Sequence, residues 1–305
     1  MNNQILQENS IENINNTHCG FISIIGRPNV GKSTLMNHLI GQKISITSRK
    51  PQTTQYKING IYTKDNYQYI FVDTPGFQTL YINKLNILLN QSVINAIANV
   101  NVILFVVEAG LWNEGDEKVL ALLPANSNII LVVNKEDKIK NKRDLKDFTN
   151  RIQAKYNFKD TYVLSAKHHT GIDVALNKLK SFLPKSPFLY DKDQLTDRSN
   201  TFLTQEIIRE KIFRYLGEEL PYNIAIEINE YKVTDELNRI IGTILVDREN
   251  YKGIVIGKKG EKLKKISLEA RLDLEALYDK KVFLQLWVKV KSGFGDDAKF
   301  LQQFE

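Results

Sequence analysis

The chain has 305 residues, of which 42% are hydrophobic and 25% charged, the balance of an ordinary globular protein with room for about two domains. Its one cysteine, Cys19, excludes an internal disulfide and predicts a reducing, cytoplasmic compartment. No apolar stretch approaches the roughly 18 residues that cross a bilayer, and segment 1–16 lacks the apolar core of a signal peptide, so we expect neither a membrane span nor secretion.

The net charge of +7 is unevenly distributed along the chain. Residues 201–305 contain 18 Lys and Arg and 18 Asp and Glu, so the whole excess lies in residues 1–200. Because net charge alone does not locate a nucleic-acid site, the local pattern matters more. The segment from Lys252 to Lys265 contains six lysines and one glutamate, which makes it a basic segment in a neutral half.

In chain order, residues 1–18 are rich in Asn and lack periodicity, which predicts a disordered tail. Over residues 19–184, apolar runs alternate with helix-length segments; the runs cover 21–25, 58–62, 67–72, 102–107, 129–133 and 162–164. This alternation predicts an α/β domain with a doubly wound, mostly parallel sheet. Ligands bind such sheets beyond the carboxyl ends of the strands, which is where the motifs of this chain occur.

The first motif follows the run 21–25 and reads Gly26-Arg27-Pro28-Asn29-Val30-Gly31-Lys32-Ser33. This spacing is typical of a phosphate-binding loop, or P-loop, whose backbone N–H groups converge on polyphosphate oxygens. Lys32 supplies a positive charge and Ser33 a hydroxyl for Mg²⁺, and the helix that starts near Lys32 adds its positive dipole end. The alternative is a chance glycine turn, which the strand and helix context disfavours.

The second motif follows the run 67–72 and reads Asp73-Thr74-Pro75-Gly76. Taken alone, it is an ordinary turn. After a P-loop, it predicts that Asp73 holds Mg²⁺ through a water and that the Gly76 N–H approaches a γ-phosphate.

Two further motifs predict guanine recognition. Asn134-Lys135-Glu136-Asp137 ends the run 129–133, and a carboxylate at position 137 accepts both N1–H and the N2 amino group of guanine, a donor pair that adenine lacks. Ser165-Ala166-Lys167 ends the next run, where we expect the Ala166 N–H to meet guanine O6 and Lys167 to lie along the base. The second motif is weak in isolation and gains its meaning from its position in the series.

Together the four motifs resemble the translation-factor class of P-loop GTPases, and the stretches 26–37, 46–54 and 73–77 are similar to the Era family in particular. The resemblance implies that GTP and GDP bind with Mg²⁺ and that GTP is hydrolysed. It also implies a switch-loop threonine, Thr54 rather than Thr53, that joins Ser33 and Asp73 on Mg²⁺ when a γ-phosphate is present. Relatives commonly carry Arg at the position of Gln55, so no role is assigned to that side chain.

Phe77 occupies the position where many GTPases keep a water-orienting glutamine, and a phenyl ring cannot orient water by hydrogen bonding. In the family, the asparagine that matches Asn29 is associated with a bound K⁺ ion. We therefore hypothesise hydrolysis that K⁺ stimulates, with Asn29, Lys32, Thr54 and Gly76 as the catalytic group.

The second half of the chain begins with a polar, aperiodic stretch over 185–199 that predicts a linker. After it, the patterns predict a separate α+β domain over 200–305. Its expected elements are a helix over 198–216, strands over 223–231 and 240–247, a short turn and helix, a longer helix ending near Leu277, and a strand over 282–290.

Within the basic segment, Gly257-Lys258-Lys259-Gly260 forms a G-x-x-G loop ahead of the longer helix. Such a loop before a helix is the signature of a KH domain, which holds about four unpaired nucleotides in an apolar groove. A solvated, lysine-rich helix start is the alternative, and the order of elements favours the KH domain. Trp287 is expected either to stack on a base or to be a core aromatic of its strand. Ile254 and Ile256 are expected to line the groove, and the expected RNA-binding residues are Gly257, Lys258, Lys259, Gly260, Lys262, Lys289 and Lys291.

Segments 206–211, 219–222 and 286–292 resemble the type II KH domain of the Era family, so the resemblance covers residues 20–305. It implies a ribosome-assembly factor that binds the single-stranded 3′ end of 16S ribosomal RNA and supports maturation of the 30S subunit. We expect a cytoplasmic monomer. Two alternatives stay open: a regulatory GTPase on the inner face of the cell membrane, and an RNA chaperone whose nucleotide site is structural.

Overall fold

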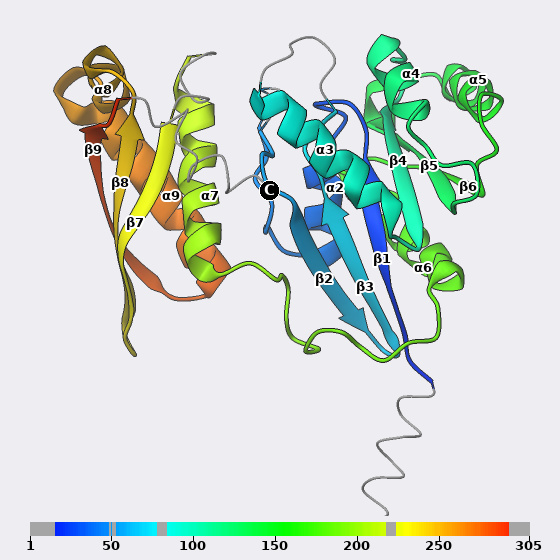
Figure 1. The fold of residues 1–305 in the computed structure, drawn as a ribbon, viewed down its shortest axis with the longest axis horizontal. Helices are drawn as coiled ribbons and strands as arrows, with labels where there is room; N and C mark the ends of the chain where they lie inside the picture. The colour runs from blue at the N-terminus through cyan, green and yellow to red at the C-terminus, as the bar shows by residue number, and fades with distance from the viewer. Residues whose placement is uncertain (1–15, 49, 51–52, 78–83, 218–223, 293–305) are drawn as a thin grey trace, which may run out of the picture. The chain divides into compact units, whose positions relative to one another are not determined.

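The computed structural model describes residues 16–48, 50, 53–77, 84–217 and 224–292 (Figure 1). Most of the expected tail 1–18 therefore lies outside the described residues. The chain divides into two compact units. The first comprises Met1–Ser45 and Thr54–Asp197, and the second comprises Ile46–Thr53 and Arg198–Glu305.

The first unit is built on a six-stranded sheet with the order β2-β3-β1-β4-β5-β6. Every neighbouring pair is parallel except β2 with β3, which confirms the predicted mostly parallel α/β domain. Only two residues join β2 to β3, and Asp65 has the positive φ of 53° that such a hairpin turn requires. The strands are β1 (His18–Ile25), β2 (Ile58–Lys64), β3 (Tyr67–Asp73), β4 (Val102–Glu108), β5 (Ile129–Asn134) and β6 (Asp160–Val163).

Helices cover both faces of this sheet, so β4 and β5 are buried along their whole length. On one face, Ile103, Phe105 and Val107 of β4 pack in a cluster with side chains of α3, α4 and α5. Because successive strand residues point to opposite faces, the alternate residues of β4 turn to the face with α2 and α6. The helices are α2 (Lys32–Ile40), α3 (Lys84–Ala98), α4 (Glu114–Leu120), α5 (Lys142–Gln153) and α6 (Ile172–Leu179).

The stretch expected as a linker, 185–199, is hydrogen-bonded to the first unit over most of its length. The Gln68 side-chain oxygen accepts from the N–H groups of Leu189 and Tyr190 at 2.9 and 3.1 Å. The Ile61 N–H donates to the Leu195 carbonyl at 2.8 Å. The division between the units therefore falls at the end of this stretch, after Asp197.

The second unit has the predicted order of helix, two strands, two helices and a strand, which confirms the α+β domain. Its sheet has the order β7-β8-β9, with β7 antiparallel and β9 parallel to β8. One face of the sheet and the three helices share a buried cluster that includes Ile208, Ile244 and Ile266. The elements are α7 (Asn200–Tyr215), β7 (Ile224–Val233), β8 (Leu237–Val246), α8 (Glu249–Ile256), α9 (Glu261–Tyr278) and β9 (Lys281–Val290).

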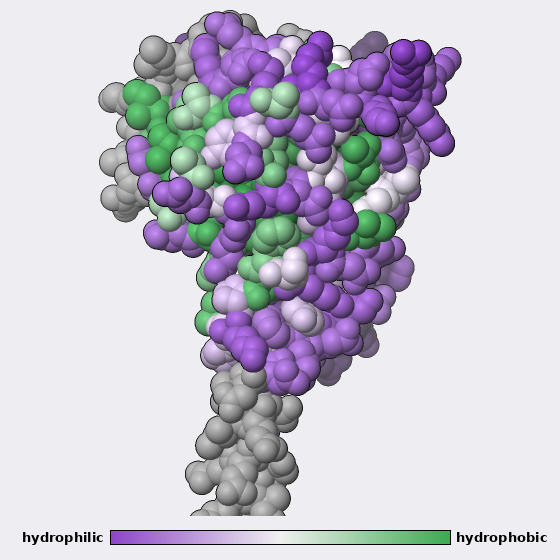
Figure 2. All heavy atoms as spheres, turned by 90° about the vertical axis from the view of Figure 1, so that its right-hand side faces the viewer, coloured by the Kyte–Doolittle hydropathy of each residue, from purple (hydrophilic) through white to green (hydrophobic). Residues whose placement is uncertain are grey.

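Figure 2 shows the side of the molecule on which α4, α5 and β6 lie. Hydrophilic side chains cover most of this surface, and hydrophobic side chains form several separate patches within it. Among the described residues, no helix is both long enough and apolar enough to cross a membrane.

Candidate functional site

The P-loop connects β1 to α2, and its lysine is buried against the loop itself. The Lys32 ammonium group donates to the carbonyl oxygens of Gly26 and Arg27, both at 3.1 Å, and the residue is 6% exposed. Burial lowers the pKa of Lys32 to about 8, although the nearby Asp73 carboxylate acts in the opposite direction. The ammonium group therefore lies inside the loop and is bound to two carbonyl oxygens, with which a bound phosphate would compete for its N–H donors.

Two positions in the motifs require glycine, because atoms of neighbouring segments occupy the space that a Cβ would need. Gly31 has φ of 100°, and a Cβ at this position would lie 2.4 Å from the side-chain nitrogen of Asn134. A Cβ at Gly76 would lie 2.8 Å from the Cα of Pro28. The loop after β3 thus lies directly against the P-loop, where the sequence places the γ-phosphate contact.

Polar side chains from three segments meet at the start of α2. The Ser33 hydroxyl lies 2.7 Å from Asp73 Oδ2 and 2.8 Å from the Thr54 hydroxyl. Ser45, which sequence reasoning missed, also donates to Asp73 Oδ2 at 2.8 Å. The structure therefore brings together the three residues predicted to hold Mg²⁺.

This polar corner fits a divalent cation. Asp73 is fully buried, and its Oδ1 accepts no hydrogen bond from the described residues. Burial raises the pKa of Asp73, and the hydrogen bond from Ser33 only partly offsets this. A cation would supply the missing charge and the missing partner. The described residues hold no group of three or more His, Cys, Asp or Glu side chains that would bind a metal by themselves, so the nucleotide phosphates would complete this site.

Asn134 joins the loops that follow β1, β5 and β6. Its side-chain nitrogen donates to the Val30 carbonyl at 2.8 Å, and its oxygen accepts from the N–H groups of Lys135 and Ala166 at 2.8 and 2.9 Å. The Ala166 N–H was expected to meet guanine O6, but in this structure it is used within the protein. That expected contact therefore competes with the bond to Asn134.

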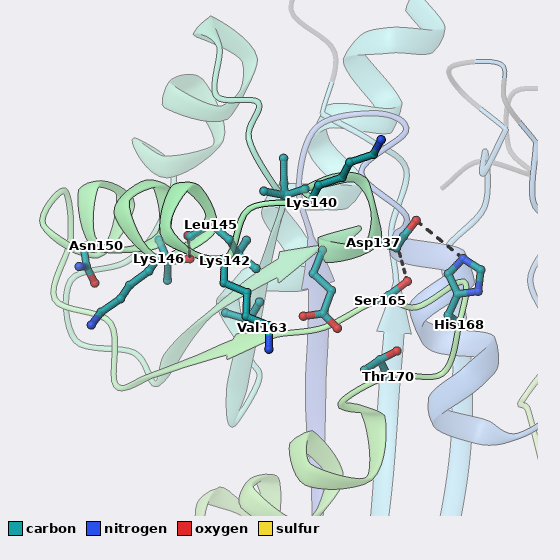
Figure 3. A pocket seen from close by; sticks show the side chains of 13 residues that line it. Asp137, Lys140, Lys142, Leu145, Lys146, Asn150, Val163, Ser165, His168 and Thr170 are labelled. Carbon is teal, nitrogen blue, oxygen red and sulfur yellow. Dashed lines mark hydrogen bonds and ion pairs between the residues drawn. The ribbon is translucent and has the colours of Figure 1, made fainter.

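Asp137 lies at the edge of a pocket of about 760 Å³ between α5 and the loop after β6 (Figure 3). Its carboxylate accepts a short hydrogen bond from the Ser165 hydroxyl, and His168 Nε2 lies 3.8 Å from its other oxygen. The hydrogen bond from Ser165 is the main reason why the pKa of Asp137 is lowered. Asp137 is therefore a negatively charged acceptor that Ser165 orients. Glu136 lines the same pocket, while Lys167 is exposed beside it.

A buried carboxylate that sequence reasoning missed ties the loop after β5 to the P-loop. Glu108, at the end of β4, accepts from Lys135 at 2.8 Å, from Lys138 at 2.6 Å and from Arg27 at 3.5 Å. Lys135 also donates to the carbonyl of Asn29 in the P-loop. Burial alone would raise the pKa of Glu108, but the hydrogen bonds from Lys135 and Lys138 outweigh it and lower the pKa.

A signal for Glu108 was present in the sequence, because it follows the apolar run 102–107 at the strand edge where the motifs lie. Arg27 has a second partner, Asp116 on α4, at 3.1 Å. Asp116 is fully buried and closes a capping box with Asn113 at the start of α4. The P-loop arginine is therefore held from two sides by carboxylates.

The remaining residues of the second motif have structural contacts. The Thr74 hydroxyl donates to the Ile24 carbonyl at 3.0 Å and is buried. Pro75 is buried, and Phe77 packs, partly buried, against the cluster formed by α3, α4 and α5. Asn29 has a positive φ of 64° at the tip of the P-loop.

The segment Ile46–Thr53, which precedes Thr54, groups with the second unit. Within that unit, the Thr47 N–H and hydroxyl both donate to one carboxylate oxygen of Glu210 on α7, at 3.0 and 3.2 Å. Glu210 is fully buried, and Lys50 donates to the carbonyls of Leu216 and Gly217 after α7. Thr47 and Lys50, in the segment that precedes Thr54, are therefore bound to α7 and to the residues that follow it, which no sequence pattern indicated.

The G-x-x-G loop lies between α8 and α9 and is open to solvent. Lys258 and Lys259 are exposed, and Lys262 is partly buried. Gly257 and Gly260 have φ values of 73° and 78°, and a Cβ at Gly260 would meet nothing within 4 Å. The 18-residue helix α9 begins directly after this loop, so its N-terminal N–H groups face an open, basic surface.

The other expected RNA-binding residues belong to or follow β9. Lys289 and Lys291 are exposed, and the Lys291 N–H pairs with the Val246 carbonyl at 2.9 Å. Trp287 is 55% exposed, which excludes the core-aromatic alternative. On α8, Ile254 is 41% exposed and Ile256 is partly buried, whereas Val255 between them is fully buried.

Two family models match the chain: one described as a 50S ribosome-binding GTPase over residues 21–135, and one described as a KH domain over residues 219–293. GTPase Era of Chromobacterium violaceum is 54% identical over 287 residues, which cover 94% of this chain and 97% of that protein. GTPase Era of Neisseria meningitidis serogroup C is 55% identical over 287 residues, covering 93% and 94%.

Among solved structures, Era in complex with MgGDPNP and nucleotides 1506–1542 of 16S ribosomal RNA superposes with a TM-score of 0.88 at 35% identity, covering 94% of this chain and 98% of that chain. The curated relatives and the superposed structure cover nearly the whole chain, and the two family models match residues 21–135 and 219–293 within it. The chain therefore belongs to the Era family of GTPases, enzymes that hydrolyse GTP.

Proposed function

We propose that this chain uses GTP to control how its KH domain binds the single-stranded 3′ end of 16S ribosomal RNA during maturation of the 30S subunit. The observation that carries the proposal is the side chain of Asn134, which joins the P-loop to both base-recognition loops at one sheet edge. Support also comes from the related Era structure that holds MgGDPNP and 16S ribosomal RNA.

In this proposal, Lys32 leaves its two loop carbonyls to pair with the phosphates, and Ser33, Thr54 and Asp73 hold Mg²⁺. The cation, when bound, neutralises phosphate charge. Thr54 and Gly76 respond to the γ-phosphate, because both lie on segments that contact the P-loop. Replacing Lys32 by Ala should abolish GTP hydrolysis and make RNA affinity independent of the nucleotide. An RNA chaperone whose nucleotide site is structural predicts instead a normal RNA affinity in every nucleotide state, in the parent protein as well.

Base selection is assigned to Asp137, with Ser165 orienting its carboxylate and Lys135 and Lys167 flanking the base. A site that accepts hydrogen bonds from specific donors of its ligand rejects a competitor that lacks them by about 10⁴-fold. Calorimetry should therefore detect GTP binding and no ATP binding, and Asp137→Ala should remove the preference. Asp147→Ala, which removes an exposed carboxylate from α5, is the matched control. Equal affinity for GTP and ATP would contradict the assignment.

Stimulation by K⁺ stays a proposal, supported by Asn29 at the tip of the P-loop and by Phe77, whose ring packs against apolar side chains. Such a ring cannot orient the attacking water, so another group must stabilise the transition-state charge. Turnover should be faster in KCl than in NaCl at matched ionic strength. Equal turnover in the two salts would argue against the ion.

RNA binding is assigned to the G-x-x-G loop, where Lys258 and Lys259 are exposed at the start of α9. Exchanging both lysines for Asp should weaken binding of a single-stranded 3′-end oligonucleotide and flatten its salt dependence. The double variant Lys118→Asp and Lys159→Asp, at exposed positions outside the Asp137 pocket, changes the charge equally in the first unit and serves as the control. An unchanged salt slope in the first variant would reject the assignment.

Coupling between the two activities is assigned to the segment Ile46–Thr53. It is continuous with Thr54, whose hydroxyl meets Ser33, while Thr47 is bound to Glu210 of α7. Thr54 is thus joined along the chain to Thr47, which α7 holds, and this connection is the proposed physical basis for coupling.

We place the protein in the cytoplasm. The basic composition leaves peripheral contact with the inner face of the membrane as the alternative. Flotation with liposomes, with and without anionic lipid, tests that contact: binding to neither kind supports the cytoplasmic assignment, and recovery with the anionic vesicles supports the membrane.

A further inference from the structure

The face of the KH sheet that turns away from the helices carries two exposed aromatic rings. Along β9, side chains alternate between the two faces: Val282 and Leu286 are 5% and 8% exposed, whereas Phe283 and Trp287 are 43% and 55% exposed. The buried residues pack in the cluster with α7, α8 and α9. The two rings therefore lie on the opposite face, which we call the outer sheet face.

The neighbours of these rings come from β8 by the strand register. Phe283 pairs with Arg239, and Trp287 pairs with Thr243. The rings are four residues apart on one strand, a separation of about 13 Å. Between them, Gln285 pairs with Ile241, so polar and apolar groups connect the two rings in one surface.

Charge on this face favours a polyanion. Its cationic side chains are Lys232, Arg239, Lys281 and Lys289, and its anionic side chains are Glu227 and Glu230, as the register of the three strands places them. Arg239 lies over the Phe283 ring at 4.9 Å and also pairs with Glu230 at 3.0 Å. A second copy of this face would bring like charges together, so self-association is disfavoured.

We propose that the outer sheet face is a second contact surface for single-stranded RNA, with Phe283 and Trp287 stacking on bases and Lys281 and Lys289 meeting phosphates. Exposed aromatics on a sheet surface stack on unpaired bases in other RNA-binding folds, and base stacking tolerates any sequence. The inference rests on the proposed function, because it assumes that the second unit binds RNA, and it extends the contact beyond the G-x-x-G loop.

Two surfaces predict a dependence on RNA length. The G-x-x-G groove holds about four nucleotides, so an oligonucleotide of that length fills the groove alone. A single strand of roughly three times that length reaches further and gains the stacking contacts. Loss of one stacked base costs about 5- to 150-fold in affinity. Trp287→Ala should therefore weaken binding of the long strand by this factor and leave the short strand unaffected.

Tryptophan fluorescence tests the contact directly, since the chain has two tryptophans, Trp112 and Trp287. In full-length protein with Trp112→Phe, the long oligonucleotide should quench Trp287 fluorescence and the short one should not. This readout needs no change on the outer sheet face. Leu272→Ala, which truncates an apolar side chain of α9 that is 51% exposed, is the matched control for Trp287→Ala.

The outcomes separate this inference from the proposed function. The double variant Lys258→Asp and Lys259→Asp should lose affinity for both oligonucleotides if the groove binds RNA. If it does, but the long oligonucleotide fails to quench Trp287 fluorescence and binds Trp287→Ala as tightly as the parent, the outer-face proposal is wrong and the groove assignment stands. If that double variant binds both like the parent, the groove assignment fails instead. Sedimentation that detects a dimer, dissolved by Trp287→Ala, would assign the face to self-association and overturn the proposal.

Discussion

Replacing Glu108 by Gln removes the carboxylate that holds the loop after β5 against the P-loop. The side chains of Glu108 and Lys135 are 10% and 23% exposed, so their 2.8 Å bond is only partly screened by solvent. A hydrogen bond to a charged group contributes about 1.5–3 kcal/mol, and this pair belongs in the lower half of that range because of the screening. Lys138 is 55% exposed and adds little.

The energy should be lost mainly from nucleotide binding, because Lys135 also donates to the Asn29 carbonyl and so orders both loops. A cost of about 1.5–2 kcal/mol corresponds to a roughly 10- to 30-fold weaker affinity for GDP. Calorimetric titration of the full-length variant with GDP, at fixed Mg²⁺ and salt, measures it. The lowered pKa of Glu108 also predicts how the stability of the fold depends on pH. The contribution of Glu108 to the free energy of unfolding is complete above the ordinary pKa of 4.5 and is lost as the pH falls through the lowered pKa.

Glu114→Gln is the matched control, since it makes the same change at an exposed position on the neighbouring helix α4. It should leave GDP affinity unchanged. The reasoning is refuted if Glu108→Gln binds GDP within twofold of the parent, or if the control loses as much affinity.

Three further changes test other parts of the structure. Gly76→Ala places a Cβ 2.8 Å from Pro28 Cα, so the loop must shift and phosphate release from GTP should slow by about 100-fold; a rate near that of the parent would count against the close approach. Glu210→Gln weakens the bonds from Thr47, so exchange of the Thr47 amide hydrogen should become about tenfold faster. An unchanged exchange rate would show that the carboxylate of Glu210 does not hold Thr47. Ile244→Ala empties a fully buried site in the KH core and should lower the free energy of unfolding by about 2–5 kcal/mol in urea titrations; a loss below about 1 kcal/mol would contradict the packing.

The fold could be predicted because each central strand is a continuous apolar run and each motif ends one of these runs. Parallel strands place their carboxyl ends at one edge, so residues as distant as Ser33 and Asp73 could be expected to meet, and they lie 2.7 Å apart. The same logic would have found Glu108, which follows such a run, if strand ends without a motif had been considered.

Other parts of the site had no signal in the sequence. The pairing of Thr47 with Glu210 joins residues 163 positions apart, and although each lies in a stretch that resembles the Era family, nothing in either stretch indicates that the two residues meet. The exposure of Trp287 depends on which face of β9 the helices cover, and the alternation of apolar residues on that strand did not decide it. The bond from the Ala166 N–H to the Asn134 side chain also had no signal in the sequence. The position of a motif suggests which groups face a base, but it does not reveal that another side chain uses the same donor.

The central claim is that the bound nucleotide governs RNA affinity, and its most direct test is the affinity of the full-length protein for a 16S 3′-end oligonucleotide with GDPNP and with GDP, at matched Mg²⁺ and salt. The account predicts affinities that differ by about 5- to 150-fold between the two nucleotide states, and a difference that disappears in Lys32→Ala. Equal RNA affinity in both states of the parent protein would contradict it.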